Sequence, residues 1–451
     1  MAKYKAYPEY KDSGVEWLGG IPKEWNVSRV KYIAPFQVGW TPPTKNDANF
    51  IGDNLWVNIS DLKGKFISST TKCISDQAAK EASMEITPKG SLLYSFKLSV
   101  GAVSFAACDL YTNEAIASFL DYAELPLSYL YYVLPKFIVE NASTNIYGAK
   151  ILNQELIKNS FVLVPDHDEA DRIASFLDHE TAKIDNLIEK QQQLIELLKE
   201  KRQAVISHAV TKGLNSEVPM KDSGVEWLGE VPKHWVSSSL KHKANIIDCK
   251  HITAEFSDTG IPVASIGEVK NWFVDLSTAK LTNERYYRSL IEGGRKPLAG
   301  DIIYSRNATV GEAAIVGSNM PPFAMGQDVC LIKTKENIIP EYILYVLKSN
   351  TIFQQLNLAM IGSTFKRINV DDIRNFSIAI PPKNEQISIV NVLKAKLEKY
   401  DQTVENAELL VNYMQERRTA LISAAVTGKI DVRDWVTPDT SDIEASEEAT
   451  A

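Results

Sequence analysis

The chain has 451 residues, 45% of them hydrophobic and 24% charged, which is typical of a soluble globular protein and predicts two to four domains. No apolar run approaches the ~18 residues of a membrane span, and no secretory signal opens the chain, so we expect a cytoplasmic protein. The four cysteines are scattered and form no CxxC pair, so we expect reduced thiols and no structural zinc site. The net charge of −8 neither supports nor excludes nucleic acid as a partner, because acidic segments can mask basic patches elsewhere.

A nine-residue segment near the start of the chain, KDSGVEWLG at residues 11–19, recurs unchanged at residues 221–229. Each copy leads into a Pro-Lys-x-Trp segment, and matching segments continue along both halves, although residues 40–80 and 250–290 differ strongly. The chain is therefore a tandem duplication of two whole domains, which share a frame and have divergent interiors. We predict that two tryptophans of the repeated segment dock each globular domain on helix ends, Trp17 and Trp227.

The first globular domain is expected at residues 1–165. Strand-like runs at residues 92–94 and 161–164, with a helical pattern at residues 127–134, indicate an α+β fold with short antiparallel strands. Basic groups in loops can approach phosphates and polar groups can read base edges, although an ordinary solvated loop is the alternative for each such residue. The candidates for DNA contact in this domain are Trp40, Lys97 and Lys150.

The first long helix is predicted at residues 166–213. Residues 169–211 contain neither Pro nor Gly and repeat apolar residues at three- and four-residue spacings, a heptad pattern that ends at Gly213 as a helix C-cap. The apolar seam consists of Leu177, Ile184, Ile188, Ile195, Leu198 and Val205.

The second globular domain is expected at residues 214–381. Strand-like runs at residues 302–304 and 376–380 and a helical pattern at residues 342–347 repeat the α+β pattern of the first domain. Its candidates for DNA contact, with the same solvated-loop alternative, are Arg306, Asn307, Lys366 and Arg367.

The second long helix is predicted at residues 382–432, with its C-cap at Gly428. Its apolar seam consists of Leu393, Leu397, Tyr400, Val404, Val411, Met414 and Leu421. A single apolar stripe needs a partner, so we expect the two helices to pack as an antiparallel coiled coil between two α+β domains in a pseudo-twofold arrangement. Residues 433–451 follow as an acidic tail, which we expect to be disordered because its last fifteen residues carry five acids and no Lys or Arg.

Some apolar residues of the helices lie off the seam and leave a second face. They either bind another protein or contact the domains of the chain itself, and both interpretations stay open at this point. These residues are Leu187, Leu194, Leu197, Leu409 and Leu410.

Three short segments resemble catalytic motifs but lack an essential part. Asn319-Met-Pro-Pro-Phe323 separates the Asn from the prolines that an adenine methyltransferase needs beside it. Asp258 with Glu268-Val-Lys270 lacks the Pro-Asp context of a metal-dependent nuclease, and Thr427-Gly-Lys lacks the first Gly of a phosphate-binding loop. We therefore expect no catalytic residue, metal or cofactor in this chain.

The combined pattern resembles the specificity (S, HsdS) subunits of type I restriction–modification systems over nearly the whole length. Besides the repeated segment, the resemblance rests on segments that open the variable regions and flank the helices. These are Gly39-Trp-Thr-Pro42, Asp248-Cys-Lys-His251, Ile380-Pro-Pro with Glu385-Gln386, and Glu416-Arg-Arg with Thr427-Gly-Lys-Ile-Asp431. The first helix departs slightly, with Asp168-Glu169 in place of the Glu-Gln pair.

The resemblance implies that two target-recognition domains each read one half of a split sequence in double-stranded DNA. The helices would set the half-site spacing and bind two methylation (M) subunits, which use S-adenosylmethionine to methylate the N6 of a flipped adenine. Restriction (R) subunits would add ATP- and Mg-dependent cleavage, so the chain itself would carry specificity and no chemistry. The rival functions are a coiled-coil adaptor that binds only proteins and an enzyme in its own right.

Overall fold

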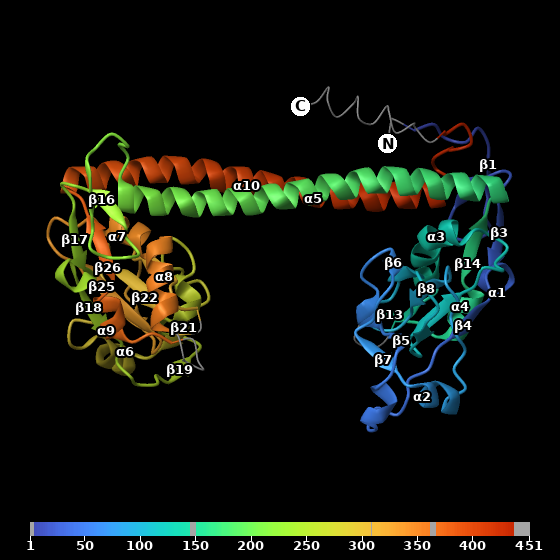
Figure 1. Cartoon of the computed structure of the whole chain (residues 1–451), viewed down its shortest axis with the longest axis horizontal. Coiled ribbons are helices and arrows are strands. Elements are labelled where there is room, and N and C mark those ends of the chain that lie inside the picture. Colours follow the sequence, from blue (N-terminus) through green and yellow to red (C-terminus); the bar gives the residue numbers. More distant parts are fainter. Residues whose placement is uncertain (1–3, 145–149, 308, 361–366, 437–451) are drawn as a thin grey trace. The chain divides into compact units, whose positions relative to one another are not determined.

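The computed structural model describes residues 4–144, 150–307, 309–360 and 367–436 (Figure 1). The chain forms two compact units: unit 1 comprises residues 1–190 and 411–451, and unit 2 comprises residues 191–410. Each unit contains one α+β head and a segment of both long helices, α5 (His167–Lys212) and α10 (Lys383–Val426). Both helices are unbroken. Gly213 directly follows α5, Gly428 lies two residues beyond the end of α10, and both have the positive φ of a helix C-cap, as predicted.

The head of unit 1 is built on a five-stranded sheet with the order β4-β11-β8-β9-β6. Its strands are β4 (Phe36–Val38), β11 (Ile116–Phe119), β8 (Leu92–Ser95), β9 (Val103–Ala106) and β6 (Phe66–Ile67). A three-stranded sheet adds β10 (Tyr111–Thr112), β5 (Asn54–Val57) and β7 (Lys72–Ile74). Two-stranded pairs join β1 (Tyr10–Asp12) to β2 (Gly20–Pro22), β3 (Asn26–Arg29) to β14 (Phe161–Val164), and β12 (Ser143–Thr144) to β13 (Lys150–Ile151). The helices are α1 (Val30–Ile33), α2 (Asp76–Glu81), α3 (Leu127–Glu140) and α4 (Gln154–Asn159), with 3-10 turns at Asp47–Phe50 and Ile59–Asp61.

The head of unit 2 repeats this frame. One sheet has the order β18 (Ala244–Asp248), β25 (Val329–Thr334), β22 (Ile302–Ser305) and β23 (Ala313–Ile315). The other has the order β19 (Phe256–Ser257), β21 (Lys280–Thr282), β20 (Ile261–Ala264) and β24 (Ala324–Met325). Pairs join β15 (Met220–Asp222) to β16 (Glu230–Pro232) and β17 (Val236–Ser239) to β26 (Ser377–Ile380). The helices are α6 (Glu284–Ile291), α7 (Pro340–Leu347), α8 (Asn350–Ala359) and α9 (Val370–Arg374), with 3-10 turns at Leu240–His242 and Ile266–Val269.

The predicted strands and helices of both heads are present, but one helix is longer than its sequence pattern indicated. The prediction ended the first helical pattern at Leu134, whereas α3 continues through Pro135 to Glu140. Proline removes one backbone donor from a helix interior and crowds the preceding turn. Here the continuation buries Phe137 and Ile138 completely in the core, and this burial outweighs the cost.

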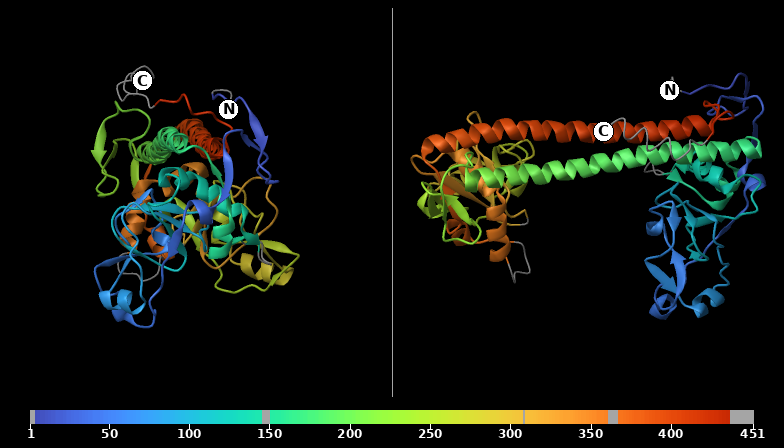
Figure 2. Two further views of the ribbon diagram at one scale, coloured as in Figure 1. Left: turned by 90° about the vertical axis from the view of Figure 1, so that its right-hand side faces the viewer. Right: turned by 45° about the horizontal axis from the view of Figure 1, so that its top comes forward.

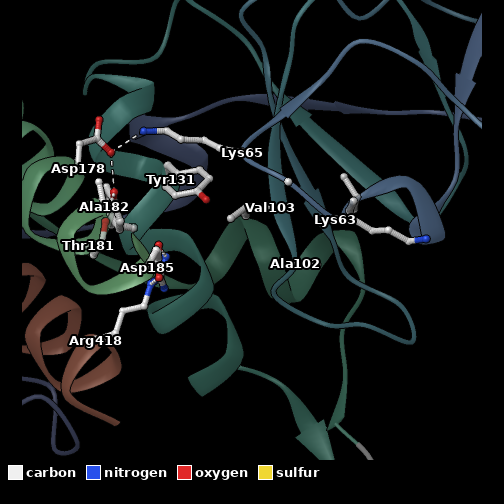
Figure 3. A pocket seen from close by; sticks show the side chains of 13 residues that line it. Lys63, Lys65, Ala102, Val103, Tyr131, Asp178, Thr181, Ala182, Asp185 and Arg418 are labelled. Atoms are coloured by element: carbon white, nitrogen blue, oxygen red, sulfur yellow. Dashed lines mark hydrogen bonds and ion pairs between the residues drawn. The ribbon is translucent and has the colours of Figure 1, made fainter. Parts of the chain in front are cut away.

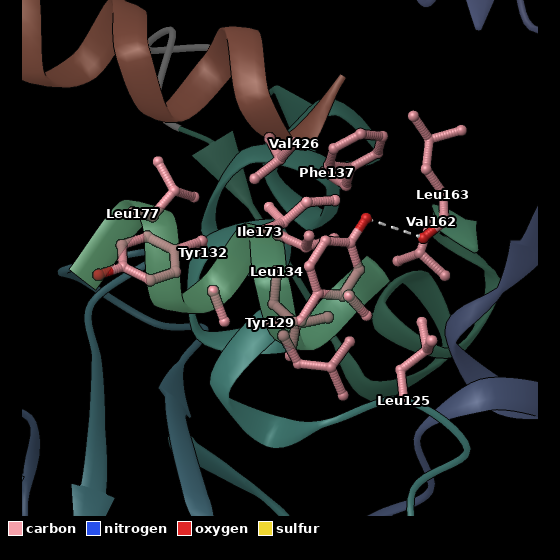
Figure 4. Packing of buried hydrophobic residues seen from close by; sticks show 14 of the residues in the cluster. Leu125, Tyr129, Tyr132, Leu134, Phe137, Val162, Leu163, Ile173, Leu177 and Val426 are labelled. Carbon is pink, nitrogen blue, oxygen red and sulfur yellow. Dashed lines mark hydrogen bonds between the residues drawn. The ribbon is translucent and has the colours of Figure 1, made fainter. Parts of the chain in front are cut away.

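The α5 and α10 segments lie side by side within each unit (Figures 1 and 2). In unit 1, Arg418 donates to Asp185 at 2.8 and 3.1 Å, while nearer the start of α5, Ile173 shares a core with Val426 (Figure 4). The segments therefore run antiparallel. In unit 2, Arg202 makes the corresponding bonds to Asp401 at 2.8 and 3.4 Å. Both residues of one pair lie 216 positions from their counterparts, so the duplication preserves the helix register.

The thirteen predicted seam residues are all buried or half-buried. Seven are buried: Leu177, Ile184, Ile195, Leu393, Leu397, Val411 and Leu421. Six are half-buried: Ile188, Leu198, Val205, Tyr400, Val404 and Met414. The off-seam residues remain exposed, including Leu194 and Leu197 on α5 and Leu410 on α10. The heptad pattern therefore separates the covered face of each helix from its free face.

A buried tyrosine hydroxyl joins a helix to a strand in each head, α3 to β14 in unit 1 and α7 to β26 in unit 2. In unit 1 the hydroxyl of Tyr129 donates to the carbonyl of Leu163 at 3.2 Å within the core that also holds Ile173 (Figure 4). In unit 2 the hydroxyl of Tyr342 donates to the carbonyl of Ala379 at 2.8 Å. Burial raises the pKa of both tyrosines, so both hydroxyls stay protonated and donate.

The tryptophans predicted to dock the heads lie nearer the surface than their neighbours. Trp17 is 43% exposed and touches Phe137 of α3 only edge-on, and Trp227 is half-buried. The fully buried anchors are Trp25 and Trp235, which come from the Pro-Lys-x-Trp segments. The difference arises because Trp17 and Trp227 sit in the turn of a surface ribbon, whereas the later tryptophans enter the cores.

Candidate DNA-reading surface

A loop of matching construction follows the central strand of each head. After β8, the Ser95 hydroxyl donates to the Lys97 carbonyl at 3.0 Å; after β22, the Ser305 hydroxyl donates to the Asn307 carbonyl at 3.2 Å. Each loop is closed by a glycine with positive φ, whose N–H donates back to the same serine's carbonyl. The backbone of the loop is thus retained while its side chains differ.

The loop of unit 1 presents Lys97 and Leu98 to solvent. Lys97 is exposed and lies 5.9 Å from the ring of the buried Phe96. Leu98 is 92% exposed and has φ +58°, a left-handed conformation that costs a residue with a Cβ about 1–2 kcal/mol. An exposed leucine in a strained backbone gains nothing for folding, and such strain is characteristic of functional sites.

The loop of unit 2 is held from inside by Arg306. Its side chain is only 5% exposed, and its Nη2 lies 2.7 Å from Oδ1 of Asp248. Its backbone N–H donates to the Asp328 carbonyl at 2.9 Å, and its carbonyl accepts the N–H of Ile368 at 3.0 Å. Arg306 was predicted to contact DNA. Its burial and ion pair instead favour a role in fixing three neighbouring segments.

The other candidates of unit 2 lie at the edge of this arrangement. Asn307 is half-buried, donates to the Asp328 carboxylate at 3.2 Å and forms a β-bridge with Arg367. Arg367 is exposed. The structure thus brings Arg306, Asn307 and Arg367 together, while Lys366 lies outside the described residues.

The candidates of unit 1 come from three separate segments. Trp40 is 56% exposed, and its backbone N–H donates to the Thr112 carbonyl at 2.9 Å. This close approach requires the preceding Gly39, because a Cβ there would lie 1.8 Å from the Thr112 carbonyl oxygen. Lys150 is exposed at the start of β13. Both side chains are therefore available to a ligand.

One group of side chains in the described part of the chain has spacing that could suit a metal ion: Asp248, Cys249 and His251. The guanidinium of Arg306 already supplies the positive charge beside it, 2.7 Å from Asp248 and 3.6 Å from the Cys249 sulfur. The Cys249 thiol donates to the Gln327 carbonyl at 2.6 Å, and burial, reinforced by Asp248, raises its pKa to about 11. A protonated thiol beside an arginine does not suit a cation.

The nuclease-like segment has a structural explanation as well. Glu268 is buried, and its carboxylate accepts the Ser265 N–H at 2.8 Å within a capping box. This cap satisfies the start of a 3-10 turn and leaves the carboxylate engaged with the backbone.

Residues 22–197 and 232–409 both match the family model described as type I restriction modification DNA specificity domain. The chain belongs to this family. Over 96% of its length it is 23% identical to the type I restriction enzyme MjaIX specificity subunit of Methanocaldococcus jannaschii, of which 99% is covered.

Solved structures of specificity subunits share the fold. One chain, from work on the structural basis of complex assembly and conformational transition of the type I R-M system, aligns with a TM-score of 0.71 and 14% identity over 91% of this chain and 99% of that chain. The HsdS subunit from Thermoanaerobacter tengcongensis aligns with a TM-score of 0.52 and 14% identity over 91% and 98%. The predicted family and fold class are therefore confirmed. No helix in the described ranges has both the length and the apolarity of a membrane span.

Two features of this specificity subunit had no clear signal in its sequence. No sequence signal marked Leu98, because a leucine in a loop is ordinary until its backbone conformation is known. The sequence signal at Arg306 wrongly indicated an exposed side chain, because arginine is usually exposed and its partner Asp248 is distant in the sequence. The alignment of Arg306 with Phe96 in the other half was the available hint, because a buried phenylalanine marks an interior position.

Proposed function

We propose that this chain is the sequence-reading, non-catalytic subunit of a type I restriction–modification enzyme, and that each head reads one half of a split target in double-stranded DNA. One observation carries the proposal: the two heads present different side chains on loops of the same construction. Lys97 and Leu98 occupy the loop of unit 1, and Asn307 occupies that of unit 2, beside Arg367. Different bases require different contacts, whereas a common frame keeps the approach to the duplex constant.

The candidate contacts divide between the heads. Trp40, Lys97 and Lys150 would serve the half-site of unit 1, and Asn307, Lys366 and Arg367 that of unit 2. Arg306 would act on DNA through the loop that it holds. Exposed lysine and arginine side chains can neutralise phosphates or bind base edges, and these roles differ in their dependence on salt and sequence.

The long helices would set the half-site spacing and bind the methylation subunits. Their free faces carry exposed apolar residues at matching positions 216 residues apart: Leu194 matches Leu410, and Leu197 matches Tyr413. Two copies of one partner would therefore meet similar surfaces. These M subunits would hold S-adenosylmethionine and methylate the N6 of adenine, while R subunits would use ATP and Mg for translocation and cleavage. This chain would supply none of those cofactors.

The test is the salt dependence of DNA binding by the assembled complex of this chain and its methylation subunits. A DNA reader loses affinity linearly on a double-logarithmic scale, with a slope near −0.9 for each phosphate neutralised. A split sequence should also outcompete random DNA by at least about a thousandfold. Affinity that does not change with salt, or equal binding of all sequences, would favour the protein-only adaptor.

A further inference from the structure

One strand position is retained in the part of the heads whose sequences diverge most. In unit 1, β6 pairs parallel with β9, with Phe66 opposite Phe105, and the Phe105 N–H donates to the Lys65 carbonyl at 2.7 Å. In unit 2, Phe273 forms a parallel bridge with Ile315, and the Ile315 N–H donates to the Trp272 carbonyl at 3.0 Å. Phe105 and Ile315 occupy the same register of the repeated frame, opposite Leu92 and Ile302 respectively. Phe66 and Phe273 are therefore structural equivalents.

Both phenylalanines are exposed despite their size. The exposed fraction is 66% for Phe66 and 56% for Phe273. A single exposed aromatic residue is unremarkable, but two at one position of a duplicated frame, in otherwise different sequences, indicate a shared use.

Each unit has a cleft between its head and its helix pair, on the side of the head where the phenylalanine lies. In unit 1 the cleft holds about 530 Å³, and Lys65, Tyr131 and Asp185 are among the residues that line it (Figure 3). Phe66 does not line this cleft itself: its ring lies 5.6 Å from that of Phe105, which stacks on Tyr131 of the lining at 5.4 Å, and the neighbouring Lys65 lines the cleft directly. In unit 2 the cleft holds about 630 Å³, Phe273 lines it directly, and Trp272 contacts Tyr345 at 4.6 Å.

The residues of α5 and α10 that line the two clefts are also equivalent in the duplication. Arg418 and Asp185 form an ion pair in unit 1, and Arg202 and Asp401 form the equivalent pair in unit 2. A tyrosine of the head completes each lining, Tyr132 in one cleft and Tyr345 in the other. A partner that binds twice would find the same aromatic anchor and the same ion pair on both occasions.

The chemistry of the unit 2 cleft favours protein over DNA as this partner, whereas the unit 1 cleft carries mixed charge, with Lys63, Lys65 and Arg418 beside Asp178 and Asp185. The unit 2 cleft is lined by four carboxylates, Glu341, Glu398, Asp401 and Glu405, and two cationic side chains, Arg202 and Lys394. Clustered carboxylates repel phosphates, and a phenylalanine offers them no hydrogen bond. Apolar anchors in pockets with polar rims are instead the usual centres of protein–protein interfaces.

We infer that Phe66 and Phe273 are equivalent anchors for the two methylation subunits, each of which places an apolar segment over the cleft of one head. The inference rests on the proposed function, because it takes the two-copy partner from there. It adds a docking surface on the heads to the free faces of the helices. The two heads are expected to bind different DNA sequences but the same methylation subunit. A surface feature that both heads retain therefore serves to bind that subunit.

The experiment measures assembly of the full chain with its methylation subunit by mass photometry over a range of concentrations. Phe66→Ser and Phe273→Ser should each weaken one of the two association steps at least about tenfold, and the double variant should weaken both. Phe66→Leu, which stays apolar, should retain most of the affinity. Tyr122→Ser is the matched control, since Tyr122 is 67% exposed on the unit 1 head and does not line the cleft, and it should change nothing.

Two results would overturn the inference. One is unchanged assembly of the double variant, provided that its circular dichroism melting curve matches that of the parent. The other is normal assembly with lower DNA affinity, which would assign the phenylalanines to DNA. Failure of the proposed function looks different: the parent complex would assemble normally but show no preference for a split sequence.

Discussion

The loops after β8 and β22 follow the same backbone path, but a different side chain is buried beneath each of them. In unit 1 the position below the loop is the buried Phe96, whereas in unit 2 it is Arg306, paired with Asp248. Apolar cores tolerate substitutions of similar volume, but loss of one member of a buried ion pair leaves an uncompensated charge. The duplicated fold therefore fixes the path of the loop, while the side chain that supports it can differ between the heads.

The largest effect should come from breaking the support in unit 2. Arg306→Met removes the buried partner of Asp248, which keeps the Cys249 N–H at 2.8 Å and the His251 ring at 3.3 Å. The Asp248 side chain is 33% exposed, so the free energy of unfolding should fall by about 2–3 kcal/mol, less than for a fully buried pair. The control Phe96→Met in unit 1 should cost less than about 1.5 kcal/mol. Urea denaturation followed by tryptophan fluorescence measures both, and equal losses would remove the distinction between the heads.

A second test separates the two heads by their contacts with DNA. Lys97→Ala and Arg367→Ala should each cost about 1–3 kcal/mol of binding free energy, each at the half-site of its own head. Fluorescence anisotropy across a salt series then assigns the contact: loss of a phosphate contact makes the slope shallower by about one unit, whereas loss of a base contact relaxes the sequence preference. Lys89→Ala is the control, because Lys89 is exposed at the opposite end of β8. An equal effect of all three changes would argue against a localised reading surface.

A smaller change in the free energy of unfolding tests whether the strained conformation of Leu98 in the unit 1 loop lowers stability while it favours DNA binding. Leu98→Gly should relieve the left-handed strain and stabilise the chain by about 0.5–1 kcal/mol, after the entropic cost of glycine, while DNA binding weakens. Leu98→Ala keeps the Cβ and should bring no such gain. Thermal melting compares the two variants, and a destabilising glycine would show that Leu98 is needed for folding.

The smallest effects should come from the two ion pairs between the helices. Arg202 and Arg418 are each about one-third exposed, so Arg202→Ala and Arg418→Ala should each cost no more than about 1 kcal/mol and should cost the same. Parallel urea titrations check this equality. A clear difference would mean that the duplicated helices are no longer energetically equivalent.

Much of the frame could be predicted because periodic and repeated signals are local. The heptad seam separated buried from exposed helix residues, and the alignment of Ser95 with Ser305 located the loops. Burial of Arg306 could not be predicted, since its partner Asp248 is brought near only by the folded sheet. The match of Phe66 with Phe273 was hidden because the intervening loops differ in length and composition, and only the pairing with β9 and β23 reveals it.

The most direct test of the central claim is an exchange of one head. Residues 30–165 are replaced by those of a relative with a different target, and the methylated motif is read by sequencing the host genome. New bases are expected in one half of the motif, with the other half and the spacing between them unchanged. A change in both halves, or in neither, would contradict the assignment of one half-site to each head.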